Sequence, residues 1–427
     1  MNFLKRTLGI LFLTATAPGL SAQTGAYWSD GSLTRTVVAD ALKDGERDHL
    51  AIRPLRMKYL PESVFRSDTG AVVLRNLGAD MWTTPERGEW AVDVLPVFLL
   101  EGGLESAGKT RGTYTLQPGV AAHLRYGKKW SLYFDARGGT EKPPTYIKDF
   151  IRAQGVVPSM GRNLADEGPA AYFAPTARLS FSPSPYFEFE LGYGQNFFGY
   201  GVQSLQLGDV ASNYPYVKIV TDVWNVQYVN IFSALTHLGA DPGNSSTHRG
   251  KFTSTHYLDW AITPRLNVGL FESIIWQAKD TLSDRGFDPN YLNPVIFYRP
   301  VEYAIGSPDN ALMGLDVAFK ATKHLLLYGQ VVIDEFLLEQ FRDNRGWWAN
   351  KWGAQLGVAS YEWPVAGLHL RAEFNTVRPF SYTHGSPIQS FTHYNEPLAH
   401  RLGTNFRELY VHGYYERDRY FGSVSWT

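Results

Sequence analysis

Three long segments of the chain combine aromatic rings with amide, carboxylate and guanidinium groups, a mixture that suits sugar binding. They cover residues 194–216, 292–310 and 381–407. Flat rings cover the apolar C–H faces of a sugar, while the polar groups bind its hydroxyls in pairs. The same residue types also satisfy the backbone of a folded loop, so packing is an equal alternative for each segment. The candidate contact residues are Arg299, Glu302, Tyr303, Asp309 and Asn310, and then Asn196, Gln203 and Asp209.

Catalytic motifs are nearly absent from the sequence. It contains no G-x-S-x-G, no H-E-x-x-H, no P-loop and no Rossmann glycine pattern. Asp334 with Glu335, and Glu188 with Glu190, meet the minimum of two carboxylates for glycoside hydrolysis. Carboxylates on alternate residues of a strand lie about 7 Å apart, which is catalytic spacing but also common in a polar barrel interior. We favour a structural role for both pairs and expect no catalytic residue, metal site or cofactor.

Composition excludes several other functions. The 40 basic and 41 acidic side chains lack the basic excess of a nucleic-acid-binding surface. The absence of cysteine removes disulfides, thiolate metal sites and cysteine nucleophiles together. A mean hydropathy of -0.23 looks soluble, but a barrel gives the same value because half of each strand faces a polar lumen.

An alternation of apolar and polar residues runs through the chain from residue 91 onward. Phe187 to Tyr193 shows it clearly, with apolar and aromatic groups at odd positions and glutamates at two even ones. Successive side chains of a strand point to opposite faces of the sheet, so one face is apolar and the other is polar. Glu272 breaks the alternation between Leu270 and Ile274, which leaves the register of that strand open. Counting such segments predicts about fourteen strands, within two or three.

Short turns alternate with long connections along this region. Short turns are predicted at residues 127–129, 182–185, 263–265, 321–323 and 364–367, and long connections at 139–170, 194–214, 236–250, 277–311, 334–350 and 377–406. This asymmetry is typical of an outer-membrane barrel, and a soluble sandwich has no reason to show it. The predicted fold is all-β, a closed transmembrane antiparallel barrel in the outer membrane.

The N-terminal region differs from the rest. Residues 1–22 resemble an export signal, with Lys5 and Arg6 before an apolar stretch that is too short to span a bilayer. Residues 23–88 contain helix formers from Thr34 to Gly45 and then several prolines, which predicts short helices and loops. We expect them to lie at the periplasmic mouth of the barrel or inside it as a plug, with a flexible leader as the alternative. Residues 89–427 form the barrel.

The long connections carry a family resemblance. Matching stretches lie at residues 195–209, 213–218, 293–303, 306–310, 328–336 and 393–406, in the same order. The chain resembles the capsule assembly Wzi family, in the Bacteroidetes branch that includes the gliding-motility protein RemB. The resemblance implies an outer-membrane barrel of about eighteen strands, so the expected range becomes about 14–18. It also implies a lectin-like role in holding capsular or exopolysaccharide at the cell surface, with links to surface adhesion and gliding.

Two departures from the family pattern affect these expectations. The run Gly199-Tyr-Gly-Val-Gln-Ser204 has Gln203 where the family has arginine, so a bidentate grip on an acidic sugar is lost there. The family also continues past the segment that matches residues 407–427, so we expect either a smaller barrel or a barrel whose C-terminal part is incomplete.

Three functions follow as hypotheses. The first is a non-enzymatic, monomeric outer-membrane protein whose partners are surface polysaccharide and outer-membrane lipid, without nucleic acid. The second is a diffusion porin, which would conduct ions, whereas a barrel plugged by residues 23–88 and 194–214 would be nearly silent. The third is an outer-membrane enzyme acting on glycans, with Asp334 and Glu335 as its acids.

Overall fold

The computed structural model describes residues 32–45, 47–55, 90–106, 109, 111–127, 129–239, 241–279, 285–294, 309–334, 350–417 and 420–427. The predicted export signal at residues 1–22 lies outside this range. So do Arg299, Glu302, Tyr303 and Glu335. Among the described residues, no helix is long and apolar enough to cross a bilayer.

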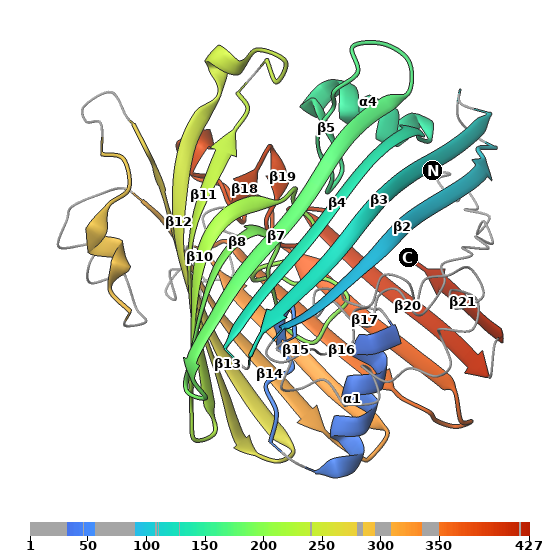
Figure 1. Ribbon diagram of the computed structural model, residues 1–427, viewed down its shortest axis with the longest axis vertical. Coiled ribbons are helices and arrows are strands. Elements are labelled where there is room, and N and C mark those ends of the chain that lie inside the picture. Colours follow the sequence, from blue (N-terminus) through green and yellow to red (C-terminus); the bar gives the residue numbers. More distant parts are fainter. Residues whose placement is uncertain are drawn as a thin grey trace.

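A single antiparallel sheet of 15 strands curls into the wall of the molecule (Figure 1). The number agrees with the count made from the sequence. In sheet order the strands are β2 (Trp90–Leu104), β3 (Gly112–Tyr126), β4 (Trp130–Lys142), β7 (Ala170–Ser184), β8 (Phe187–Gly194), β10 (Tyr214–Val223), β11 (Val226–His237), β12 (Arg249–Thr263), β13 (Leu266–Gln277), β14 (Asn310–Lys320), β15 (Leu325–Ile333), β16 (Trp352–Ser360), β17 (Leu368–Val377), β20 (Phe406–Arg417) and β21 (Tyr420–Trp426).

The smaller elements lie in the connections and in the N-terminal region. They are helices α1 (Ser32–Asp44) and α4 (Thr145–Gln154), 3-10 helices η3 (Ser245–Thr247), η4 (Pro289–Leu292) and η5 (Pro387–Gln389), and the two-residue strands β1 (Ile52–Arg53), β5 (Val156–Val157), β6 (Gly161–Arg162), β9 (Phe197–Phe198), β18 (Thr392–His393) and β19 (Glu396–Pro397). Among the described strands, β2 pairs only with β3 and β21 only with β20, so the expected hydrogen-bonded closure is not seen between these two end strands.

The alternation of short turns and long connections is confirmed. All five predicted turns separate neighbouring strands, and the six long connections fall within a few residues of the predicted bounds. The turn between β10 and β11 was missed, because its residues Trp224 and Asn225 carry no glycine or proline signal. Trp224 adopts a positive φ of 58° there and is almost fully exposed.

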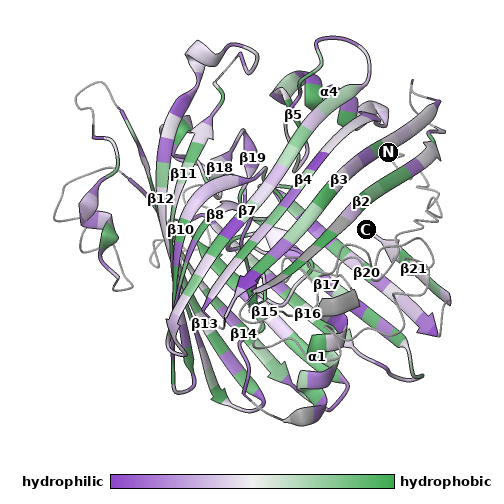
Figure 2. Ribbon diagram, viewed as in Figure 1, coloured by the Kyte–Doolittle hydropathy of each residue, from purple (hydrophilic) through white to green (hydrophobic). Residues whose placement is uncertain are grey.

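The outer face of the wall is apolar over the height of a bilayer. On β3 the outward residues Tyr114, Leu116, Val120 and Tyr126 are each 38–40% exposed. The row from Tyr114 to Tyr126 rises by roughly 28 Å at a strand tilt of 45°, which matches the apolar band of an outer-membrane barrel with an aromatic residue at each edge. Figure 2 shows the same alternation of green and purple along the strands. The strands therefore belong in an outer membrane.

The interior of the barrel is packed. Buried side chains of the wall form one cluster with Val37 and Leu50 of the N-terminal region and with Leu205 and Leu207 of the connection between β8 and β10. Phe198 from this connection stacks on Tyr257 of the wall at 4.4 Å between ring centroids. The inward-folded connection and the described part of the N-terminal region, the two segments considered as a plug, therefore occupy much of the interior.

Tyrosine rings of the wall lie flat over glycines of the next strand. Tyr328 on β15 pairs with Gly357 on β16, and a Cβ at Gly357 would come within 2.1 Å of the ring. Tyr216 on β10 pairs with Gly192 on β8 in the same way, with a Cβ at 2.2 Å from the ring. Only glycine leaves room for these rings, so the large and small residues of the interior face are matched across strands.

The described part of the N-terminal region lies against the interior of the wall. Helix α1 ends before Gly45, which has a φ of 68°, as the glycine after the helical pattern predicts. Asp48 forms a buried ion pair with Lys320 of β14, and His49 contacts Asp259 of β12 at 3.0 Å. Strand β1 pairs with β9 in the inward-folded connection. Near the short turns, Lys43 of α1 forms an ion pair with Glu362 at 2.6 Å.

The outer face at β12 and β13 departs from the apolar pattern, and this explains Glu272. Glu272 pairs with His256 of β12 on the outer face, yet both are fully buried. Residues 285–294 fold over the outside of the wall beside β12 (Figure 1). There Tyr291 packs on Trp276 at 4.8 Å, and its carbonyl accepts a hydrogen bond from Ser254 Oγ at 2.9 Å. The register around Glu272 is regular, and a connection rather than lipid covers this polar patch.

Candidate functional site

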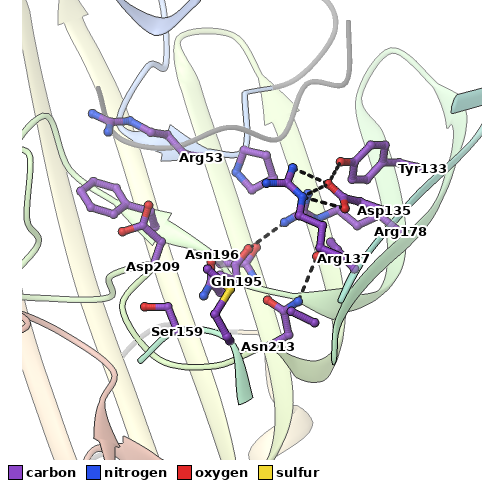
Figure 3. A pocket seen from close by; sticks show the side chains of 15 residues that line it. Arg53, Tyr133, Asp135, Arg137, Ser159, Arg178, Gln195, Asn196, Asp209 and Asn213 are labelled. Atoms are coloured by element: carbon purple, nitrogen blue, oxygen red, sulfur yellow. Dashed lines mark hydrogen bonds and ion pairs between the residues drawn. The ribbon is translucent and has the colours of Figure 1, made fainter. Parts of the chain in front are cut away.

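A partly enclosed pocket lies inside the barrel, between strands β4 and β7, the inward-folded connection 195–213 and the N-terminal region (Figure 3). Its volume is ≈ 90 Å³. This is space for roughly six water molecules, or about one sugar ring. Its lining is mostly polar or aromatic and comprises Arg53, Pro54, Tyr133, Asp135, Arg137, Ser159, Met160, Ala174, Thr176, Arg178, Gln195, Asn196, Phe197, Asp209 and Asn213.

Strands β4 and β7 supply the charged wall of the pocket. Tyr133, Asp135 and Arg137 alternate along β4 and therefore share its inner face. Asp135 is directly opposite Thr176, and Tyr133 is opposite Arg178 on β7. Arg137 donates to Asp135 through Nε and Nη2 at 2.9 and 2.6 Å, and Tyr133 donates its hydroxyl to the same carboxylate at 3.0 Å. Both oxygens of Asp135 are thus already engaged.

Two of the three guanidinium nitrogens of Arg178 form hydrogen bonds within the site. Its side chain is only 8% exposed, and it donates through Nε to the Tyr216 hydroxyl and through Nη2 to the Gln195 carbonyl, both at 3.1 Å. Its third nitrogen, Nη1, is buried and has no hydrogen-bond partner among the described residues. The side chain is therefore fixed in position by the wall and by the connection.

The inward-folded connection forms the floor of the pocket. Asn213 anchors one end by donating to the Pro175 carbonyl at 2.6 Å and to Thr176 Oγ1 at 2.9 Å. At the other end Gly199, with a φ of 128°, passes so close to Gln330 that a Cβ would lie 2.2 Å from its amide nitrogen. Only glycine allows this backbone shape and this approach. The connection therefore has a defined path across the interior, and Gln195, Asn196 and Asp209 lie along it.

Arg53 closes the pocket from the N-terminal region. Figure 3 shows it on the opposite side of the pocket from Tyr133, Asp135 and Arg137. Its Nη2 donates to the Gly199 carbonyl at 3.2 Å, and its guanidinium lies 4.5 Å from the centre of the Phe197 ring. A residue far from β4 in the sequence thus completes the site.

Glu396, in the connection between β17 and β20, forms hydrogen bonds with two other long connections beside the pocket. It accepts hydrogen bonds from the backbone nitrogens of Ser159 and Ser212 at 2.7 and 2.8 Å, and from the Ser212 hydroxyl at 2.5 Å. Burial nevertheless raises the pKa of Glu396 to about 7, against the effect of these three donors. Ser159 lines the pocket, so protonation of Glu396 affects a hydrogen bond that positions one edge of the pocket.

The predicted contact residues separate into distinct places. Asn196 and Asp209 line the pocket. Gln203 does not, because its carbonyl accepts from Gln355 at 2.9 Å and its side chain from the Arg401 backbone at 3.2 Å. Gln203 is therefore a packing residue of the connection rather than a member of the pocket.

Asp309 and Asn310 belong to a second polar cluster near residues 285–291. Asp309 accepts hydrogen bonds from Arg285 at 2.8 Å and from the Tyr291 hydroxyl at 2.6 Å. Asn310 donates to the Gln389 carbonyl at 3.0 Å. The contacts of Asp309 hold the segment that covers the outer wall and leave Asp309 enclosed, whereas Asn310 contacts the connection between β17 and β20. Arg299, Glu302 and Tyr303 lie outside the described residues, so their role stays a prediction.

The two carboxylate pairs considered for hydrolysis have structural contacts. Glu190 forms an ion pair with Lys218 at 2.7 Å and accepts the Tyr216 hydroxyl at 2.6 Å. Asp334 accepts a hydrogen bond from the Tyr382 backbone nitrogen at 2.8 Å. Within the described ranges, no cluster of three or more histidine and acidic side chains could hold a metal ion.

Sequence reasoning missed the three arginines of the pocket. The alternation of apolar and polar residues puts Asp135 and Arg137 on one face of their strand, but it does not show which inward residues of different strands meet. Arg178 had the same signal on its own strand. No local sequence pattern marks Arg53, because its position depends on the pairing of β1 with β9.

Comparison with known proteins bears on the fold. No family model matches the sequence, and no curated protein matches it. Among solved structures, Wzi, described as an outer-membrane protein involved in group 1 capsule assembly in Escherichia coli and as a carbohydrate-binding β-barrel, is similar over 91% of this chain and 81% of that chain. The sequence identity is 12% and the TM-score is 0.51.

This chain is an outer-membrane β-barrel. Two other outer-membrane protein structures match more loosely. OmpT of Vibrio cholerae covers 80% of this chain and 99% of its own at 12% identity and a TM-score of 0.33. A mutant porin of Rh. blastica covers 79% of this chain and 94% of its own at 12% identity and a TM-score of 0.36. At these identities the likeness concerns the fold, and the site must be argued from its own residues.

Proposed function

We propose that this protein is a non-enzymatic outer-membrane barrel that binds capsular or exopolysaccharide and holds it at the cell surface. The observation that carries the proposal is the pocket inside the barrel. It combines aromatic faces of Tyr133 and Phe197 with amides of Gln195, Asn196 and Asn213, in the space of about one sugar ring. The carbohydrate binding described for the structurally similar Wzi supports the same substrate class.

The proposal extends to the family and its biology. We infer that the chain is a Wzi-type protein that acts as a monomer with outer-membrane lipid around it. A place in the Bacteroidetes branch, with surface adhesion or gliding as an outcome, rests on the sequence resemblance. Deletion of the gene in a gliding host would test this part separately, since loss of motility with intact capsule retention would separate adhesion from polysaccharide assembly.

A diffusion porin is the second candidate, and the packed interior argues against it. The described part of the N-terminal region and the inward-folded connection occupy much of the barrel interior and pack with wall residues in one continuous cluster. Ions need a wet path, and a packed apolar cluster with paired charges gives them none. We expect the full-length protein in a planar bilayer to stay near the leak current. Stable single-channel steps of porin size would favour the second candidate.

Capsule retention with matched variants tests the proposed function. Cells that lack the protein are complemented with the wild type, with the double variant Asn196→Ala and Asp209→Ala, or with Gln203→Ala as a control in the same connection. We expect the double variant to release polysaccharide into the medium while Gln203→Ala retains it, at equal amounts of barrel in the membrane. Full retention by the double variant, or equal loss by Gln203→Ala, would contradict a role for the pocket.

A further inference from the structure

We propose that the N-terminal region relays the occupancy of the pocket to the periplasmic mouth of the barrel. A ligand in the pocket would hold residues 47–55 and helix α1 docked against the interior of the wall, and an empty pocket would let them open more often. This inference rests on the proposed function, because the pocket must bind a ligand. It adds a second function, which is to report that ligand on the other side of the membrane.

The N-terminal region forms one side of the pocket. Arg53 and Pro54 line it. Strand β1 pairs with β9, which puts Arg53 opposite the lining residue Phe197, with its guanidinium 4.5 Å from the centre of that ring. The Ala51 carbonyl also accepts a hydrogen bond from the Gly199 nitrogen at 2.8 Å. A ligand that touches Arg53 or Phe197 therefore meets a surface that is complete only while β1 is docked.

The same stretch of chain is anchored at the end of the barrel that carries the short turns. Asp48 forms the buried ion pair with Lys320, whose backbone nitrogen donates to the Arg265 carbonyl at 2.8 Å, beside the turn between β12 and β13. The Asp48 carbonyl accepts a hydrogen bond from Asn267 Nδ2 at 2.7 Å. From Asp48 to Arg53 the chain reaches at most about 17 Å. This short stretch therefore connects the turns with the pocket directly.

Helix α1 extends the connection to the mouth of the barrel. The Ala41 carbonyl of the helix accepts a hydrogen bond from the Lys320 side chain at 3.2 Å. Lys43, in the last turn of the helix, forms its ion pair with Glu362 where the two side chains are 39% and 40% exposed. Figure 1 shows that the helix ends among the short turns. Short turns face the periplasm in outer-membrane barrels, so a movement of α1 changes the surface that a periplasmic protein can contact.

Packing makes these segments one unit. Val37 and Leu42 of α1, and Leu50 and Ile52 of the following stretch, belong to the same buried cluster as Leu207 of the inward-folded connection. Release of one segment exposes apolar surface of the others, so we expect them to open together. A ligand shifts an equilibrium by the ratio of its affinities for the two states. A ligand that requires β1 in the pocket must therefore favour the docked state of α1 as well.

Thiol labelling with and without a ligand tests the relay. The chain has no cysteine, so Leu50→Cys and Ala39→Cys, at residues that are each 4% exposed, each give one buried thiol. Each full-length variant in detergent micelles reacts with a maleimide, alone and with saturating oligosaccharides released from the surface polysaccharide of the cells that make the protein. Calorimetry on the same samples measures binding. We expect the ligand to slow both labelling rates by at least about fivefold, the lower end of typical coupling between sites. Ala51→Cys, at another buried residue of the same stretch, takes the place of Leu50→Cys if that variant does not fold.

Control variants connect the effect to the pocket and to the N-terminal region. Ile274→Cys places a buried thiol on the outer wall, under the connection that covers it, and the ligand should leave its labelling rate unchanged. In the Leu50→Cys background, the double variant Asn196→Ala and Asp209→Ala should lose the slowing together with binding, whereas Gln203→Ala should keep both. Lys320→Met should label faster but be slowed by the same factor, because that factor is the ratio of the affinities of the ligand for the docked and undocked states.

The outcomes separate the relay from the function on which it rests. Binding with an unchanged labelling rate of Leu50→Cys overturns the relay and leaves polysaccharide binding in place. Slower labelling of Leu50→Cys without slower labelling of Ala39→Cys overturns transmission to the mouth of the barrel. Equal slowing of Ile274→Cys also overturns the relay, since it shows a general stabilisation of the barrel. Absence of binding overturns the proposed function and the relay with it.

Discussion

Removing the positive charge of Lys320 should release the N-terminal region from the interior of the barrel. Lys320 of β14 and Asp48 form an ion pair whose side chains are only 9% and 10% exposed. Removing one partner of a buried pair leaves an uncompensated charge and typically costs about 3–5 kcal/mol. Lys320→Met should therefore weaken docking of residues 47–55 by this amount. Replacing both partners, as in Asp48→Asn with Lys320→Met, should cost far less, because no lone charge remains.

The absence of cysteine makes docking measurable. A single Leu50→Cys change, in a buried position of the same region, gives one thiol whose labelling rate reports how often the region opens. A cost of about 3–5 kcal/mol predicts labelling faster by roughly two to four orders of magnitude in Lys320→Met. The doubly substituted protein should label at close to the rate of the parent protein that carries Leu50→Cys alone.

The pH dependence of this variant has a definite sign. Burial already raises the pKa of Asp48 with Lys320 present, and loss of Lys320 should raise it further. A carboxyl whose pKa is raised in the docked state stabilises docking at low pH and loses that contribution as pH rises through the raised pKa. Labelling of Lys320→Met should thus accelerate with rising pH more than the intrinsic thiol reactivity explains. Equal labelling of the variant and the parent at every pH would refute the reasoning, and so would a parent protein that labels as fast as a free thiol.

Three further predictions concern the wall and its connections. The pKa of Glu396 is raised to about 7, so its carboxyl loses a proton as pH rises from about 5 to 8. Over this range the free energy of unfolding of the wild type, measured in urea, should fall by on the order of 2 kcal/mol relative to Glu396→Gln. Parallel pH profiles of the two proteins would contradict this. Gly357→Ala should cost about 1–3 kcal/mol, because its Cβ would lie 2.1 Å from a tyrosine ring, whereas Gly385→Ala, in open space, should be close to neutral. Tyr291→Ala should cost about 3–5 kcal/mol and change the fluorescence of Trp276, on which the ring packs at 4.8 Å; an unchanged spectrum would show that residues 285–294 do not cover the wall.

The strands were predictable because their signal is local. A period of two places side chains on alternate faces regardless of what the rest of the chain does, so β8 and β4 could be recognised from a few residues each. The turn at Trp224 was missed because a left-handed residue without glycine leaves no mark in the composition. The register of the strand at Glu272 could not be predicted for a different reason. Its cover comes from residues 285–294, which the pattern of β13 cannot show.

The site was predictable only in part, because it is a meeting of distant segments. The aromatic and amide content of residues 194–216 pointed to Asn196 and Asp209, and both line the pocket. Gln203, from the same stretch, faces other partners, since one connection that crosses a barrel presents its residues to several walls. Arg178 and Arg53 meet there only once β7 and β9 are in place, which no local pattern encodes.

The proposed function requires a sugar to bind inside the barrel. The most direct test is a crystal structure of the full chain with a fragment of the surface polysaccharide bound. We predict density for one sugar ring in the pocket, with an apolar face of the ring beside Phe197. Sugar density confined to the outermost connections, with the pocket filled by water alone, would contradict the central claim.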